Sequence, residues 1–134
     1  MTKFMLLTKY GATESVEPMT NWDPEDIKAH LDFLQTLNRE LTNSGELVGA
    51  LALTGPESAK VVVSDGVAAP VITDGPFPES KELLAGYQMV DVESEARAIE
   101  IAARVSAAPG PGGVPIQQAI EVRQVMGAPP GADV

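Results

Sequence analysis

The sequence has no cysteine, a single histidine and only nine basic residues among 134. Without cysteine the chain can form no disulfide, thiolate metal site, iron–sulfur cluster or cysteine nucleophile. Nineteen Asp and Glu outnumber the basic residues, which do not cluster, and the net charge is −10. Because such a chain repels phosphate backbones, we expect no nucleic-acid partner and interpret the charge as a source of solubility.

Long apolar runs are also missing. The longest covers residues 47–53 and is interrupted by Gly49, so it is far shorter than the ~20 residues that span a bilayer. The apolar N-terminal segment turns polar at Thr8, which is too early for a secretory signal. We therefore expect a cytoplasmic protein with no membrane partner.

Motifs of familiar chemistry are scarce as well. We find no Gly-x-Ser-x-Gly nucleophile elbow, phosphate-binding glycine loop, dinucleotide fingerprint, calcium loop or His-x-x-x-His pair. A metal would have to rely on one histidine and scattered carboxylates. We expect no metal site and no bound cofactor.

What is present indicates one globular domain. Hydrophobic residues make up 44% of the chain and charged residues 21%, which is ordinary for a folded protein. We place the domain at residues 1–126 and expect the tail, 127–134, to be disordered because it is rich in Gly and Pro. Strand-like apolar segments occur at 4–9, 46–53, 60–64, 67–73, 87–92 and 120–125. The second of these reads as a buried strand.

Two helices are marked by their first residues. Asp23 can accept hydrogen bonds from free backbone amides as N-cap, and Pro24 suits the first helical position. Ser94 can cap a second helix in the same way. Each helix carries an apolar stripe at helical spacing. The stripes are Ile27, Leu31, Leu34, Leu37 and Leu41 in the first helix, and Ala98, Ile101, Ala102 and Val105 in the second.

The order β, α, β, hairpin, β, α, β predicts an α+β fold, a ferredoxin-like protomer with an antiparallel sheet and two main helices on one face. Asp65-Gly66 predicts a type I′ turn in the hairpin, and Pro70 suggests an edge position. The other face of the sheet needs cover, which a second copy of the same sheet would provide. We therefore predict a homodimer.

Two features could carry chemistry. His30 lies inside the first apolar stripe, so it should face inward, either as a satisfied core histidine or as a general acid or base. The loop Asp74-Gly75-Pro76-Phe77 links two strands at a sheet end, where it serves either as a structural turn or as part of a site. Aromatic residues near strand ends or loops either line a pocket or pack ordinarily. They are Tyr10, Trp22, Phe77 and Tyr87.

These residues give the chain a resemblance to the YCII-related family, in the branch named for its Asp-Gly-Pro-Phe (DGPF) loop. The resemblance is carried, in the family's order, by Tyr10-Gly11, Asp65-Gly66, Asp74-Gly75-Pro76-Phe77 with Glu79, Lys81 and Glu82, Gly86-Tyr87, and Ile120-Glu121-Val122-Arg123. It implies a dimeric α+β barrel. It also implies a His and Asp active-site pair, carried here by His30 and Asp74.

The resemblance leaves the activity open between classes. One reading is a cofactor-independent lyase or isomerase in which His30 moves a proton and Asp74 orients it, with Tyr10, Gly75, Pro76, Phe77 and Tyr87 around a small-molecule ligand. The alternative is a non-catalytic ligand-binding or regulatory accessory module, since members of the branch are often encoded near alternative sigma factors. A third reading is that the Asp74 loop only braces the dimer.

Overall fold

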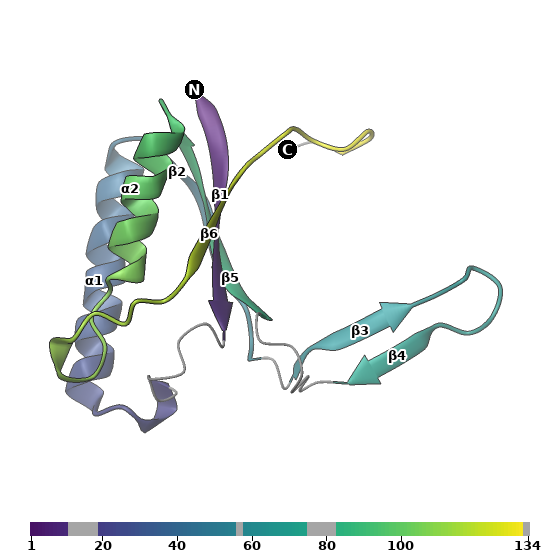
Figure 1. Ribbon diagram of the computed structural model, residues 1–134, viewed down its shortest axis with the longest axis horizontal. Coiled ribbons are helices and arrows are strands. Elements are labelled where there is room, and N and C mark those ends of the chain that lie inside the picture. The colour runs from purple at the N-terminus through teal and green to yellow at the C-terminus, as the bar shows by residue number, and fades with distance from the viewer. Residues whose placement is uncertain (11–18, 56–57, 75–82, 133–134) are drawn as a thin grey trace.

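The computed structural model describes residues 1–10, 19–55, 58–74 and 83–132. Four strands form one antiparallel sheet in the order β2-β5-β1-β6. They are β1 (Thr2–Tyr10), β2 (Leu47–Ala52), β5 (Leu83–Val92) and β6 (Ile120–Gln124). Helices α1 (Pro24–Asn43) and α2 (Glu95–Ser106) lie on the same face of this sheet (Figure 1). The predicted α+β, ferredoxin-like protomer is thus confirmed.

The smaller elements lie outside the four-stranded sheet and its two helices. Strands β3 (Lys60–Val63) and β4 (Val71–Asp74) pair only with each other, as a separate two-stranded sheet that projects from the domain (Figure 1). Short 3-10 helices occur at η1 (Met19–Asn21) before α1 and at η3 (Pro111–Gly113) after α2. Residues 125–132 follow β6 without helix or strand. The prediction that this end of the chain is disordered stays a prediction.

The core follows from the alternation of side chains along the central strands. Successive residues of a strand point to opposite faces, and the residues of β1 and β5 that face the helices are buried. The fully or nearly fully buried apolar set is Phe4, Leu6, Val90 and Val92 from the strands, with Leu37, Leu41, Ala98, Ile101 and Ala102 from the helices. Each large side chain in this set stabilises the fold by roughly 1.5–3 kcal/mol.

The intervening residues of the strands define a second surface, which we call the open face. It is the side of the four-stranded sheet away from the helices and includes Met5, Leu7, Leu51, Tyr87 and Met89. Leu51 is 62% exposed. None of the described helices covers this surface (Figure 1).

The two helix starts differ in how they are capped. The Ser94 side chain accepts a hydrogen bond from the backbone N–H of Arg97 at 3.2 Å, as predicted. Asp23 does stand at the N-cap of α1, but its side chain makes no capping hydrogen bond; only its backbone carbonyl accepts from Asp26 and Ile27. The predicted side-chain role of Asp23 was therefore wrong, although the helix begins where expected.

Two further expectations need correction. Strand β2 was predicted to be buried, yet Val48 is 50% and Leu51 62% exposed, because β2 is an edge strand of the sheet with an open face. The hairpin does not turn at Asp65-Gly66 with two residues, since Val63 pairs with Val71. Asp65 instead accepts from the backbone N–H groups of Val67 and Ala68, which builds a wider loop.

One partly buried ion pair ties α2 to the start of β2. The Arg97 guanidinium donates two hydrogen bonds to the Glu46 carboxylate, at 2.8 and 2.9 Å. This pairing lowers the pKa of Glu46 from an ordinary 4.5 to about 2, against an opposing effect of burial. The Glu46 side chain is 16% exposed, so solvent screens the pair only partly.

The Glu46 pair predicts a specific loss of stability in acid. Because the pKa of Glu46 is depressed, its contribution is fully present above about pH 4.5 and is lost as the pH falls toward 2. Glu46→Gln should lower the free energy of unfolding at pH 7 by about 1–3 kcal/mol, and its difference from the wild type should shrink below pH 4. Urea denaturation at pH 7, 4.5 and 3 measures this.

Glu40→Gln is the matched control, since Glu40 pairs with Arg104 in an exposed position. Glu40→Gln should lower the free energy of unfolding by less than about 1 kcal/mol. Equal losses for the two variants would contradict the role given to Glu46.

The difference between the two caps predicts different losses of stability when each cap residue is replaced by alanine. Ser94→Ala should lower the free energy of unfolding by about 1 kcal/mol, because it removes the acceptor for the Arg97 N–H. Asp23→Ala should cost less than half as much, since only an interaction with the helix dipole is lost. Urea denaturation of both variants compares them, and a larger loss for Asp23→Ala would refute the assignment.

Candidate functional site

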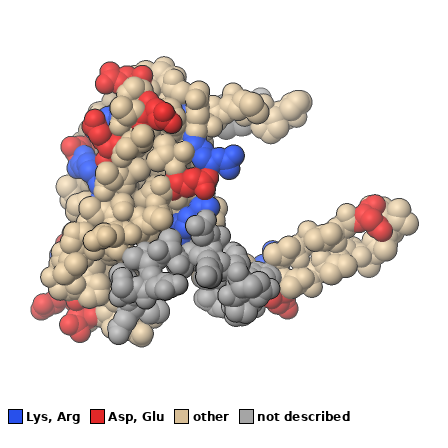
Figure 2. Space-filling view, viewed as in Figure 1, with Lys and Arg blue, Asp and Glu red and all other residues tan. Residues whose placement is uncertain are grey.

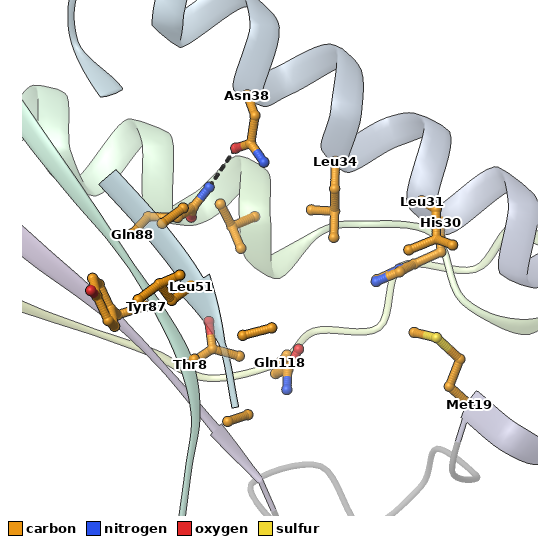
Figure 3. Close-up of a pocket in the computed structure, with 15 residues that line it drawn as sticks. Thr8, Met19, His30, Leu31, Leu34, Asn38, Leu51, Tyr87, Gln88 and Gln118 are labelled. Atoms are coloured by element: carbon orange, nitrogen blue, oxygen red, sulfur yellow. Dashed lines mark hydrogen bonds between the residues drawn. The ribbon is translucent and has the colours of Figure 1, made fainter. Parts of the chain in front are cut away.

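A cavity of about 440 Å³ lies between α1 and the sheet (Figure 3). Its sheet side includes four small residues, Ala50 and Ala52 of β2 with Ala85 and Gly86 of β5. Small side chains leave space where the large residues of the core would fill it. The cavity therefore begins where the packed core ends.

One face of α1 forms the opposite wall. His30, Leu34 and Asn38 follow at intervals of four residues, so they lie one above the other along the helix, over roughly 12 Å. Figure 3 shows the three side chains pointing toward the sheet, with Leu34 between the two polar residues. The wall is polar at both ends and apolar in the middle.

His30 is held in one orientation. Its side chain faces inward as predicted, and the residue is 7% exposed. Ring atom Nδ1 lies 3.0 Å from the backbone oxygen of Pro109, and the Trp22 ring packs edge-on against the imidazole at a centroid distance of 5.5 Å. Since a carbonyl oxygen only accepts, Nδ1 carries the hydrogen, and in the neutral ring Nε2 is then an acceptor.

No described residue forms a hydrogen bond with Nε2 of His30. The imidazole lies in the cavity wall, with its ring directed into the space (Figure 3). An unprotonated ring nitrogen in this place can accept a hydrogen bond or a proton from a bound molecule.

The other polar groups of the cavity are neutral. Gln88 of β5, 9% exposed, donates from its amide nitrogen to the Asn38 side-chain oxygen at 2.7 Å. Gln118 donates to the backbone oxygen of Lys9 at 3.2 Å, and Thr8 adds a hydroxyl. Among the described residues of the lining, none carries an ionised carboxylate, ammonium or guanidinium group.

Asp74 lies elsewhere in the protomer. It ends β4 on the projecting hairpin, where its carboxylate pairs with Lys60 at 2.6 Å and its side chain is 72% exposed. Figure 1 places β4 on the side of the sheet away from α1, which carries His30. One protomer therefore does not bring His30 and Asp74 together.

The remaining predicted site residues can be placed only in part. Tyr87 belongs to the residues that line the cavity, although the strand register turns its side chain toward the open face. Gly75, Pro76 and Phe77 lie outside the described residues, and of Tyr10 only the backbone, at the end of β1, is described.

Several residues of the cavity were not singled out from the sequence. Asn38 could have been found, since it lies two helical turns after His30 on the same face. Gln88, Gln118 and Pro109 could not, because no local pattern indicates that Gln88 and Pro109 bond to side chains of α1 or that Gln118 lines the cavity.

Over the described ranges, no group of three or more His, Cys, Asp or Glu side chains is arranged to hold a metal ion. Neither described helix combines the length and apolar character needed to cross a membrane.

The arrangement of sheet, helices and cavity is that of a small α+β protein with a pocket under its first helix. Residues 2–119 match the YCII-related domain, and the chain belongs to that family. It is also similar to an uncharacterized protein of Rhizobium meliloti (strain 1021), with 28% identity over 85 residues, which are 63% of this chain and 68% of the relative.

Two glycines of the sheet should respond differently to substitution by alanine, because they differ in the space around them. A Cβ on Gly86 would lie 2.7 Å from the backbone oxygen of Leu51, whereas a Cβ on Gly49, in the neighbouring strand, would meet nothing within 4 Å. Gly86→Ala should therefore lower the free energy of unfolding by about 1–3 kcal/mol, and Gly49→Ala should not lower it. Urea denaturation tests both; a stable Gly86→Ala variant would contradict the close approach of β2 and β5.

Proposed function

We propose that the cavity binds an uncharged small organic molecule and that His30 transfers a proton to and from it, as in a cofactor-independent lyase or isomerase. The observation that carries this proposal is the hydrogen bond from Nδ1 of His30 to the Pro109 oxygen, which leaves Nε2 as an acceptor in the cavity wall. A buried, oriented imidazole with a free acceptor nitrogen is suited to general base catalysis.

In the proposed step, Nε2 of His30 takes a proton from a carbon atom of the bound molecule. The Pro109 oxygen, which accepts from Nδ1, stabilises the resulting imidazolium. Return of the proton to another atom of the same molecule gives an isomerisation. Departure of a leaving group, with the proton passed to that group, gives an elimination.

The lining supports an uncharged ligand. The strand register turns the Tyr87 side chain toward the open face. The other described polar residues of the lining contribute an imidazole, three amides and a hydroxyl; they are His30, Asn38, Gln88, Gln118 and Thr8. A buried ion would find no opposite charge among them, and a net charge of −10 disfavours the approach of anions. The cavity volume, about 440 Å³, falls within the range typical of small-molecule pockets.

Asp74 has no part in this step within one protomer, because it lies on the projecting hairpin in a pair with Lys60. A His and Asp pair would require Asp74 to come from a second copy of the chain. In the proposal, the Pro109 oxygen orients the imidazole.

The second candidate is a non-catalytic ligand-binding or regulatory accessory module, for instance one linked to an alternative sigma factor system. The hydrogen bond between Gln88 and Asn38 favours it, since paired buried amides fix a cavity and recognise a ligand without reacting. The two candidates share the ligand and differ only in proton transfer.

The branch of the family, the cellular location and the oligomeric state are also part of the proposal. We place the chain in the Asp-Gly-Pro-Phe branch on the strength of Asp74-Gly75-Pro76-Phe77, and we propose a cytoplasmic homodimer joined through the open face. The apolar residues of that face, such as Leu51 at 62% exposure, support an interface there.

Binding can be followed through Trp22, the only tryptophan, whose ring contacts His30. Uncharged fragments, cyclohexanone among them, should change the Trp22 fluorescence of the wild type. Leu34→Phe fills the cavity and should weaken that response by about tenfold, whereas Gln35→Phe, on the exposed side of α1, should leave it unchanged. Equal responses of the two variants would place binding outside the cavity.

Proton transfer is tested by exchange in D₂O. The wild type should accelerate the exchange of the α-protons of bound cyclohexanone, by about 10² or more over His30→Asn. We choose Asn because its amide can still donate to the Pro109 oxygen, which preserves the fold. Fragment binding without any His30-dependent exchange would favour the non-catalytic module.

A further inference from the structure

The projecting hairpin, residues 60–74, forms what we call the arm. All eight residues of its strands β3 and β4 are exposed, and Figure 1 shows it extending away from the four-stranded sheet. A two-stranded hairpin has little stability of its own in water. The arm therefore needs a surface to pack against.

The side chains of the arm are suited to such packing. Five of the eight strand residues are apolar and β-branched: Val61, Val62, Val63, Val71 and Ile72 are 47–64% exposed. By the strand register, Val61, Val63 and Val71 share one face with Thr73. No other described strand pairs with either long edge of the arm, and an exposed apolar edge of this kind attracts another chain.

We propose that the arm clasps a second copy of this chain, along the flank of the copy that sits on the open face. The inference rests on the proposed homodimer and adds to it the surface that each copy grips. Its basis is the direction of the arm: it leaves the sheet on the side opposite the helices, beside the open face (Figure 1). A copy seated on the open face thus lies next to the arm.

The charge distribution favours a second copy over other occupants. The chain has nine basic and nineteen acidic residues, but the open face carries Lys3, Lys9 and Arg123 against Asp91 and Glu121. Figure 2 shows basic side chains in the recess beside the arm. This face carries three basic and two acidic side chains in a chain whose net charge is −10, so an acidic second copy meets little repulsion there.

The arm itself is neutral where it would make contact. The only charged residues of its strands, Lys60 and Asp74, pair with each other at 2.6 Å at its base. A basic protein partner would find no acidic patch on these strands. Asp65 lies in the loop at the tip of the arm. The apolar strands of the arm, with no net charge, beside a mildly basic face fit a second copy of an otherwise acidic chain.

The first experiment compares dimer dissociation constants by analytical ultracentrifugation. The triple variant Val61→Thr/Val63→Thr/Val71→Thr removes apolar surface from one face of the arm and keeps β-branched residues. Its dissociation constant should rise at least roughly tenfold over the wild type. Val114→Thr, an exposed substitution in the loop beyond α2, is the control and should change it less than about twofold.

The second experiment identifies what the arm touches. A chain with p-benzoylphenylalanine replacing Val63 is mixed with its ¹⁵N-labelled form above the dissociation constant, irradiated, and digested for mass spectrometry. Crosslinks that join a ¹⁴N peptide to a ¹⁵N peptide show that the arm lies on the second copy. We expect these mixed crosslinks.

The possible results distinguish the role of the arm from the existence of the homodimer. A wild type that dimerises, with crosslinks confined to peptides of one isotope, overturns the role of the arm whatever the variants do, and leaves the homodimer standing. A wild type that is monomeric at every concentration overturns both. A weakened triple variant together with mixed crosslinks supports the inference.

Discussion

The structure depends on the burial of one face of the four-stranded sheet, which the described helices α1 and α2 cover. Leu6 and Val90 meet Leu37 and Ile101 in the core, where all four side chains are almost fully buried. The intervening residues must then face the other way, which creates the open face. Helix α1 runs for 20 residues and α2 for 12, and α1 also forms a wall of the cavity, whose sheet side includes small residues. The core and the cavity therefore lie on the helix side of the sheet, and the open face lies on its other side.

The cavity depends on contacts between distant parts of the chain. The Pro109 oxygen that fixes His30 is 79 residues away in the sequence, and Gln88 is 50 residues from Asn38. These polar groups are satisfied by one another, so they do not destabilise the fold, and they leave the acceptor nitrogen of His30 without a partner among the described residues. The same neutral polar groups are the basis for the proposal that the cavity binds uncharged molecules.

Sequence patterns within one helix correctly predicted the features that depend only on residues of that helix. Ser94 caps α2, and the stripe of α1 correctly placed Leu37, Leu41 and His30 inside. Leu31, in the same stripe, is 52% exposed, because at its position α1 faces the cavity rather than packed side chains. The exposure of β2 and the isolation of the hairpin could not be predicted, since both depend on which strands become neighbours in the sheet. For the same reason the sequence suggested a partnership of His30 and Asp74 that one protomer does not form.

The central claim is that His30 presents an unprotonated Nε2 to the cavity. As the only histidine, it can be observed alone by long-range ¹H–¹⁵N correlation NMR of its ring in the neutral state. We predict the tautomer with hydrogen on Nδ1, held by the Pro109 oxygen, and a pyridine-type ¹⁵N shift for Nε2. A hydrogen on Nε2 would mean that this nitrogen is a donor, and would contradict both the bond to Pro109 and the proposed proton acceptor.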